Sequence, residues 1–89
     1  MASGIASWYW DGPGLYAAMP GWRFGDRPYE LVVRAGRRSV VVTVRDACGC
    51  PGGRLIDLSG EAFARLAPRS TGLLRVTIEW VALDPKEPS

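Results

Sequence analysis

Residues 40–68 read VVVTVRDACGCPGGRLIDLSGEAFARLAP. This stretch begins with an alternating apolar run, passes through a loop of Gly, Cys and Pro, and continues into a short strand and an amphipathic helix. Alternation of β-branched residues is typical of a half-buried strand. Two carboxylates, Asp46 and Asp57, lie at the two ends of the loop. We therefore expect the loop to bring both acids to one mouth of a small barrel.

The rest of the chain predicts further short strands, because apolar runs are separated by Gly and Pro turns. The expected strands are 4–10, 15–19, 29–34, 39–45, 54–56 and 73–82. Ser59 is the expected N-cap of a helix over 60–67, which Pro68 ends. Short strands at close spacing predict an all-β domain closed into a six-stranded barrel with one short helix, since closure removes exposed strand edges. We expect this domain over 1–83 and a disordered tail over 84–89.

The alternation also predicts which side chains are buried. Val40, Val42 and Val44 share one face of the strand over 39–45, and we expect that face to form part of the core. Asp46 has the same parity, so its side chain is expected to start from the buried side of the strand end. A carboxylate in such a place needs hydrogen-bond partners.

Composition excludes several classes of function. The net charge of +2 is too small to indicate a nucleic-acid partner. The chain has no histidine, which removes imidazole bases and the commonest metal ligand. The start of the chain has neither the pattern of a signal peptide nor that of a membrane span, so we expect no membrane partner. Arg34, Arg37 and Arg38 form a solvated hairpin tip or a contact to an acidic polymer.

The two cysteines, Cys48 and Cys50, are separated by one residue. They are too few for a zinc site. A disulfide between them would close a very tight ring, so we expect free thiols. With no histidine to act as a base, a thiol nucleophile is not expected. The pair does not decide the redox compartment.

Three segments together resemble the double-psi β-barrels of the rare lipoprotein A type and the first domain of expansins. They are GIASWY at 4–9, the run from Val42 to Ala67 with VRDAC, IDLS and AFARLA, and the strand RVTIEW at 75–80 after Gly72. Their order and spacing extend the resemblance over residues 4–82. It implies a double-psi β-barrel that interacts with a cell-wall glycan, and a location outside the cell or in its envelope.

The resemblance also implies site residues. Asp57 matches the central acid of the glycan groove and Asp46 the acid after the valine-rich strand. Ser7 and Tyr9 match the small hydroxyl and the tyrosine of the first strand, with Ser7 as a partner for Asp57. Met19 and Leu55 stand where related proteins carry histidines. No metal and no cofactor is implied.

Two functions remain open at this point. In the first, the chain is a glycan module, either an expansin-like binder or a lytic transglycosylase-like enzyme in which Asp57 is the principal general acid and base and Asp46 is its supporting catalytic residue. In the second, the barrel is a structural or interaction domain with a protein partner, such as part of a phage tail or a secreted assembly. Asp57 then only pins the loop by accepting hydrogen bonds, and Tyr9 belongs to the core instead of stacking on a sugar ring.

Overall fold

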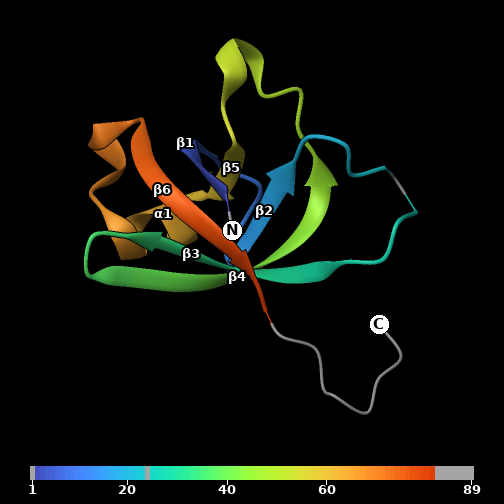
Figure 1. Ribbon diagram of the computed structural model, residues 1–89, viewed down its shortest axis with the longest axis horizontal. Helices are drawn as coiled ribbons and strands as arrows, with labels where there is room; N and C mark the ends of the chain where they lie inside the picture. The colour runs from blue at the N-terminus through green and yellow to red at the C-terminus, as the bar shows by residue number, and fades with distance from the viewer. Residues whose placement is uncertain (1, 24, 82–89) are drawn as a thin grey trace.

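In the computed structural model, which describes residues 2–23 and 25–81, six strands close into one barrel (Figure 1). The strands are β1 (Ala2–Tyr9), β2 (Tyr16–Met19), β3 (Tyr29–Ala35), β4 (Arg38–Ala47), β5 (Ile56–Ser59) and β6 (Leu74–Trp80). Helix α1 (Gly60–Leu66) and two 3₁₀ turns, η1 (Pro51–Gly53) and η2 (Arg69–Thr71), complete the described chain. The predicted all-β barrel with one short helix is confirmed. The tail predicted over 84–89 lies outside the described residues.

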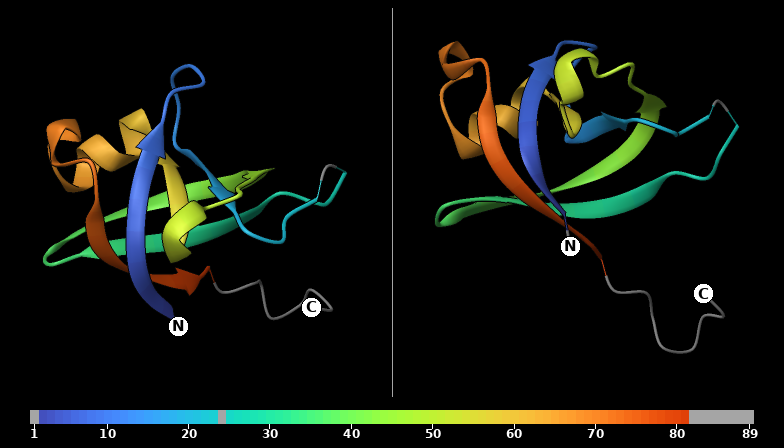
Figure 2. Two further views of the ribbon diagram at one scale, coloured as in Figure 1. Left: turned by 90° about the horizontal axis from the view of Figure 1, so that it is seen from above. Right: turned by 45° about the horizontal axis from the view of Figure 1, so that its top comes forward.

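The order of strands around the barrel is β1-β5-β2-β4-β3-β6. The pairs β1/β5 and β2/β4 are parallel, and the other neighbours are antiparallel. Residues 48–55 cross from β4 to β5, which are not neighbours in the barrel because β2 lies between them. This crossing segment passes close to β1, where the backbone N–H of Leu55 donates to the carbonyl of Ile5 at 2.8 Å (Figure 2).

The core follows the predicted alternation along β4. Val40, Val42 and Val44 are all at most 5% exposed, whereas the intervening Val41 is 45% exposed. Strand β6 buries Val76 and Ile78 in the same way, but Trp80 at its end is 65% exposed. The alternation therefore predicts burial in the middle of a strand and fails at the last residue of β6, although Trp80 still pairs with Leu31 of β3.

Helix α1 closes one end of the core. Ser59 is its N-cap, as predicted, and accepts a hydrogen bond from the N–H of Ala62 at 3.1 Å. Its apolar face, Ala62, Phe63 and Leu66, is buried. The helix ends one residue earlier than expected because Ala67, which precedes Pro68, is extended. Among the described residues no helix is long and apolar enough to cross a membrane.

Candidate functional site

The predicted site residues lie in one row across four strands of the barrel. Ser7 of β1 pairs with Asp57 of β5, Asp57 pairs with Ala18 of β2, and Ala18 pairs with Asp46 of β4. Residues paired directly across neighbouring strands share a face of the sheet. The small Ala18 therefore separates the two acids on one surface. Tyr9, two residues after Ser7, lies on the same side of β1.

A β-bulge decides where Asp46 points. The pairing of β2 with β4 runs from Ala17 with Val44 to Ala18 with Asp46, so Arg45 is an extra residue in β4. An extra residue reverses the alternation beyond it. Asp46 therefore points away from the valine core and is half-buried beside a surface cavity. The prediction that it starts from the buried face is wrong for this reason.

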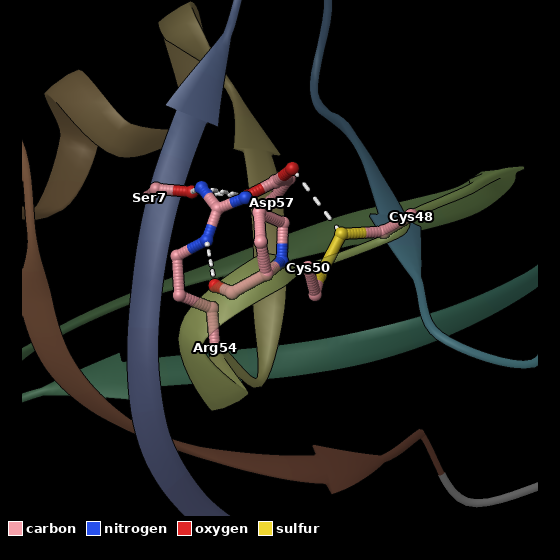
Figure 3. The surroundings of a disulfide bond; sticks show 6 residues. Ser7, Cys48, Cys50, Arg54 and Asp57 are labelled. Carbon is pink, nitrogen blue, oxygen red and sulfur yellow. Dashed lines mark hydrogen bonds and ion pairs between the residues drawn. A yellow bond between two sulfur atoms is a disulfide. The ribbon is translucent and has the colours of Figure 1, made fainter.

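Asp57 lies in a network of polar contacts (Figure 3). Its Oδ1 accepts a hydrogen bond from Ser7, as predicted, and forms an ion pair with Nη1 of Arg54 at 3.0 Å. Arg54 also donates to Ser7 and, through Nε, to the carbonyl of Pro51 at 3.2 Å. The Asp57 side chain is 18% exposed. The guanidinium thus connects the acid, the first strand and the crossing loop.

The other carboxylate oxygen of Asp57 faces a disulfide. Oδ2 lies 3.2 Å from Sγ of Cys48, which is bonded to Sγ of Cys50. The prediction of free thiols is therefore wrong. Gly49 carries no side chain, and Cys50 adopts a left-handed φ of 40°, so the chain doubles back and the two Cα atoms lie 5.1 Å apart. That separation is within the usual range for disulfides, roughly 4.4–6.8 Å.

Metal binding was predicted to be absent, and that stays a prediction. Within the described part of the chain, Cys48, Cys50 and Asp57 place their donor atoms within 4.8 Å of one another. The two sulfur atoms are joined, so they are not thiolates and do not supply the anionic ligands that zinc binds.

Asp46 finds the hydrogen-bond partner that its position requires on the first strand. Its Oδ2 accepts a hydrogen bond from the Tyr9 hydroxyl at 2.6 Å. The Tyr9 ring packs edge-on against Tyr16, whose own ring lies 3.9 Å below the guanidinium carbon of Arg45. Burial, and then the hydrogen bond to Asp46, raise the pKa of the Tyr9 phenol well above its usual value of 10.0. Tyr9 is thus anchored at its hydroxyl, with its ring in the wall of the cavity.

The raised pKa of Tyr9 predicts how stability depends on pH. As the pH rises above about 10, an unfolded tyrosine loses its proton while folded Tyr9 keeps it. The unfolded state then binds fewer protons, so the free energy of unfolding falls. We expect a smaller fall between about pH 9 and pH 11 in Tyr9→Phe than in the parent, measured by urea unfolding with tryptophan fluorescence. Equal falls in the two proteins would show that Tyr9 does not titrate differently in the folded state.

An open cavity of about 430 Å³ joins these groups on the outer face of the barrel. Its lining residues are Tyr9, Trp10, Asp11, Ala18, Asp46, Ala47 and Asp57. Trp10 was not predicted as a site residue, because in the expected strand over 4–10 it would lie on the face opposite to Tyr9. Strand β1 ends at Tyr9, so the alternation does not extend to Trp10. The only signal for it in the sequence is a large aromatic residue directly before an Asp-Gly turn.

The indole of Trp10 packs against Gly60 at the start of α1 and is otherwise open to solvent. It is 58% exposed, yet a Cβ added to Gly60 would lie 2.9 Å from its Cε3 atom. The ring packs this close to the helix because Gly60 has no side chain. Tyr16 fixes the turn that follows, because its hydroxyl accepts from the N–H of Asp11 at 2.9 Å and donates to the carbonyl of Gly12 at 2.8 Å. The aromatic face is thus presented to solvent by a well-supported turn.

Comparison with known families decides what kind of barrel this is. The family model described as lytic transglycolase matches residues 1–78. The chain belongs to this family. The lytic transglycolase barrel seen here is the double-psi β-barrel that the sequence resembles. A search of curated proteins gives no significant match.

Solved structures give two kinds of neighbour for this lytic transglycolase barrel. One is the Streptomyces papain inhibitor, with a TM-score of 0.78 and 26% identity over 91% of this chain and 94% of the inhibitor. The other is an expansin from Clavibacter michiganensis. Its apo form has a TM-score of 0.76 and 27% identity, and a mutant in complex with cellohexaose has a TM-score of 0.77 and 23% identity. The match covers 97% and 98% of this chain but 52% of each expansin chain, so this chain spans about half their length.

Proposed function

We propose that this protein binds a cell-wall glycan in the cavity between Trp10 and the two acids, Asp46 and Asp57, and that it does not cleave the glycan. The observation that carries the proposal is the exposed Trp10 indole in the same cavity as Asp46 and Asp57. A sugar ring presents C–H groups on its faces and hydroxyls at its edge. An aromatic face packs against the C–H groups, and carboxylate oxygens accept hydrogen bonds from the hydroxyls.

The contacts of the acids support binding over cleavage. A lytic general acid has to carry a proton to the glycosidic oxygen. Asp57 instead forms an ion pair with Arg54, and an ion pair requires the carboxylate. Asp46 accepts the hydrogen bond of Tyr9. Both groups are therefore arranged to accept hydrogen bonds, which is what recognition of sugar hydroxyls needs.

The disulfide supports a location outside the cytosol. Disulfides persist mainly in oxidising compartments such as the extracellular space and the periplasm. A protein in either place meets the glycan of a cell wall. An extracellular or envelope location is part of the proposal.

The test is retention on insoluble polymers. The protein is incubated with purified peptidoglycan and with cellulose, and the supernatants are analysed by mass spectrometry for released sugars. Cellohexaose is a suitable soluble probe, because an expansin of the same fold has been solved with it. We expect retention on one of the two polymers and no released product.

Two results would contradict this proposal. Absence of retention on both polymers would exclude glycan binding. Release of anhydro-sugars that stops in Asp57→Asn would instead identify Asp57 as the general acid of a lytic enzyme, and binding without cleavage would be wrong.

A second candidate function is inhibition of a protease. The specific observation is that this chain and the Streptomyces papain inhibitor match over nearly the whole length of both, whereas the expansins extend far beyond the match. Titration of papain with the purified protein tests it. Full inhibition at stoichiometric amounts, together with no retention on glycan, would favour this second function over the first.

A further inference from the structure

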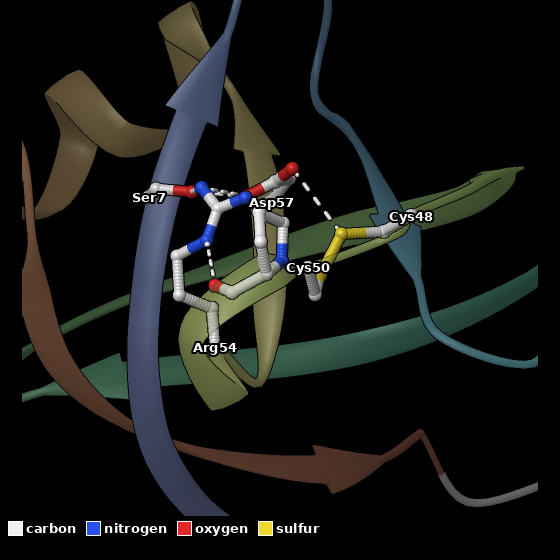
Figure 4. A network of polar contacts seen from close by, with 6 residues as sticks. Ser7, Cys48, Cys50, Arg54 and Asp57 are labelled. Carbon is white, nitrogen blue, oxygen red and sulfur yellow. Dashed lines mark hydrogen bonds and ion pairs between the residues drawn. A yellow bond between two sulfur atoms is a disulfide. The ribbon is translucent and has the colours of Figure 1, made fainter.

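We propose that the Cys48–Cys50 disulfide undergoes exchange with external thiols, so that this loop accepts two electrons from a dithiol. The disulfide closes a ring with a single residue, Gly49, between its cysteines. A cross-link that short removes few conformations from the unfolded chain and stabilises the fold little. It also joins no two strands of the barrel. Its position beside Asp57 points to a chemical role (Figure 4).

The two cysteine residues differ in accessibility. Cys48 is half-buried, whereas Cys50 is only 7% exposed. Gly49 and Pro51 are exposed, so a reagent approaches the ring directly from solvent. An incoming thiolate therefore attacks Sγ of Cys48, and Cys50 is the leaving group.

Asp57 favours the reduced form of this ring. Its Oδ2 lies 3.2 Å from Sγ of Cys48, and in the disulfide that sulfur carries no proton to donate. Once reduced, the Cys48 thiol donates a hydrogen bond to the carboxylate over the same contact. Arg54 and Ser7 hold the carboxylate through its other oxygen, so it is already in place. A charge-assisted hydrogen bond present in only one redox state shifts the equilibrium toward that state.

The backbone of Cys50 acts in the same direction. With φ at 40°, it is the one non-glycine residue in the described part of the chain with a positive φ. L-residues populate this region sparsely, because the Cβ atom is crowded there. The ring holds Cys50 in that conformation, and reduction releases it.

The exchange balances in two steps. A substrate thiolate attacks Sγ of Cys48, the bond between Cys48 and Cys50 breaks, and the Cys50 thiolate takes up a proton. The second substrate thiolate then attacks the substrate sulfur of the mixed disulfide and releases Cys48, whose thiol donates to Asp57. The substrate dithiol becomes a disulfide, and the protein gains two electrons and two protons. A small disulfide of the oxidised-glutathione type reverses the reaction.

The first test compares the folded protein with its own loop. The oxidised protein and an oxidised synthetic peptide of residues 46–52 are each equilibrated with glutathione buffers and, separately, with a dithiol peptide. Free thiols are then alkylated, and the reduced fraction is measured by mass spectrometry. We expect the equilibrium constant for reduction of the protein to be about tenfold larger than that of the loop peptide. Reduction by the dithiol peptide alone would identify a protein dithiol as the electron donor. Reduction by both the dithiol peptide and glutathione would show that the loop accepts electrons from thiols in general. A disulfide that survives in a buffer that reduces the loop peptide would overturn the proposal.

Single-cysteine variants test the order of attack. Cys50→Ser leaves Cys48 free, and Cys48→Ser leaves Cys50 free. Each variant is first converted to its mixed disulfide with glutathione, and we expect a dithiol to reduce the mixed disulfide on Cys48 about tenfold faster than the one on Cys50, because Cys48 is the more accessible residue. Equal rates would contradict the assignment of Cys48 as the attacked sulfur.

A further pair of variants tests the role of Asp57. Asp57→Asn weakens the acceptor of the Cys48 thiol, so we expect the equilibrium to move about fivefold toward the disulfide. Glu79→Gln makes the same chemical change at an acid that pairs with Arg34 on β3 and should leave the equilibrium unchanged. Equal shifts in the two variants would show that Asp57 does not select the reduced form.

Discussion

Replacing Ser59 with alanine is expected to lower the free energy of unfolding by about 3 kcal/mol, because three hydrogen bonds meet at one buried hydroxyl. Oγ of Ser59 donates to the carbonyl of Gly14 at 2.7 Å and accepts from the N–H groups of Tyr16 at 3.3 Å and Ala62 at 3.1 Å. The residue is 0% exposed. Water therefore has no access to the groups that the substitution leaves unpaired.

Urea unfolding monitored by tryptophan fluorescence measures this loss. Loss of a helix N-cap alone costs about 1 kcal/mol, so a larger effect identifies the bonds to Gly14 and to Tyr16 at the start of β2. Ser70→Ala is the matched control, since Ser70 is exposed in η2. A loss of only about 1 kcal/mol would mean that the bonds to Gly14 and Tyr16 contribute nothing measurable.

The strands and the helix were predictable because their signals are local. Alternating valines identify β4, and the N-cap at Ser59 identifies the start of α1, without reference to the rest of the chain. The start of the fifth strand was less predictable. The N–H of Leu55 bonds to Ile5 outside the regular ladder, so β5 begins at Ile56 instead of at residue 54. Nothing in the local sequence reports that bond.

The geometry of the site was less predictable because it depends on contacts between distant segments. The orientation of Asp46 depends on a bulge against Ala18, and its partner Tyr9 is 37 residues away in the chain. The pairing of Ser7 with Asp57, by contrast, followed from the family resemblance. The disulfide depends on the backbone of Cys50, whose conformation no propensity predicts. Contacts between distant segments therefore determine the orientation of Asp46 and the state of the cysteines, which residue type alone does not predict.

The contacts of Asp57 connect the two proposals. The same carboxylate lines the cavity and touches the sulfur of Cys48. A reduced Cys48 would occupy one of the two acceptor sites of Oδ2 and so leave one fewer for a sugar hydroxyl. The redox state of the loop and the occupancy of the cavity are therefore expected to influence each other. Redox equilibrium without glycan and glycan binding by the oxidised protein measure the two effects separately.

Replacing Trp10 with alanine is expected to weaken glycan binding about thirtyfold, which corresponds to about 2 kcal/mol. Trp10 is an exposed large hydrophobic residue in the lining of the cavity, and aromatic residues are frequent centres of binding energy. Its truncation should leave the barrel intact, because the indole rests on the surface over Gly60 and lies outside the buried core. Isothermal titration calorimetry with cellohexaose or soluble peptidoglycan fragments gives the dissociation constant.

Two further variants make this result specific to the cavity. Trp80→Ala removes an indole that is 65% exposed but stacks on Tyr29, away from the lining residues, so binding should not change. Gly60→Ala keeps the indole of Trp10 but places a methyl group where only 2.9 Å is available, so the ring must shift and binding should weaken by a smaller factor. Equal losses in the Trp10 and Trp80 variants would mean that exposed tryptophans bind the polymer without a defined site. No loss in either would place the glycan-binding surface outside this cavity, and the proposed site would be wrong.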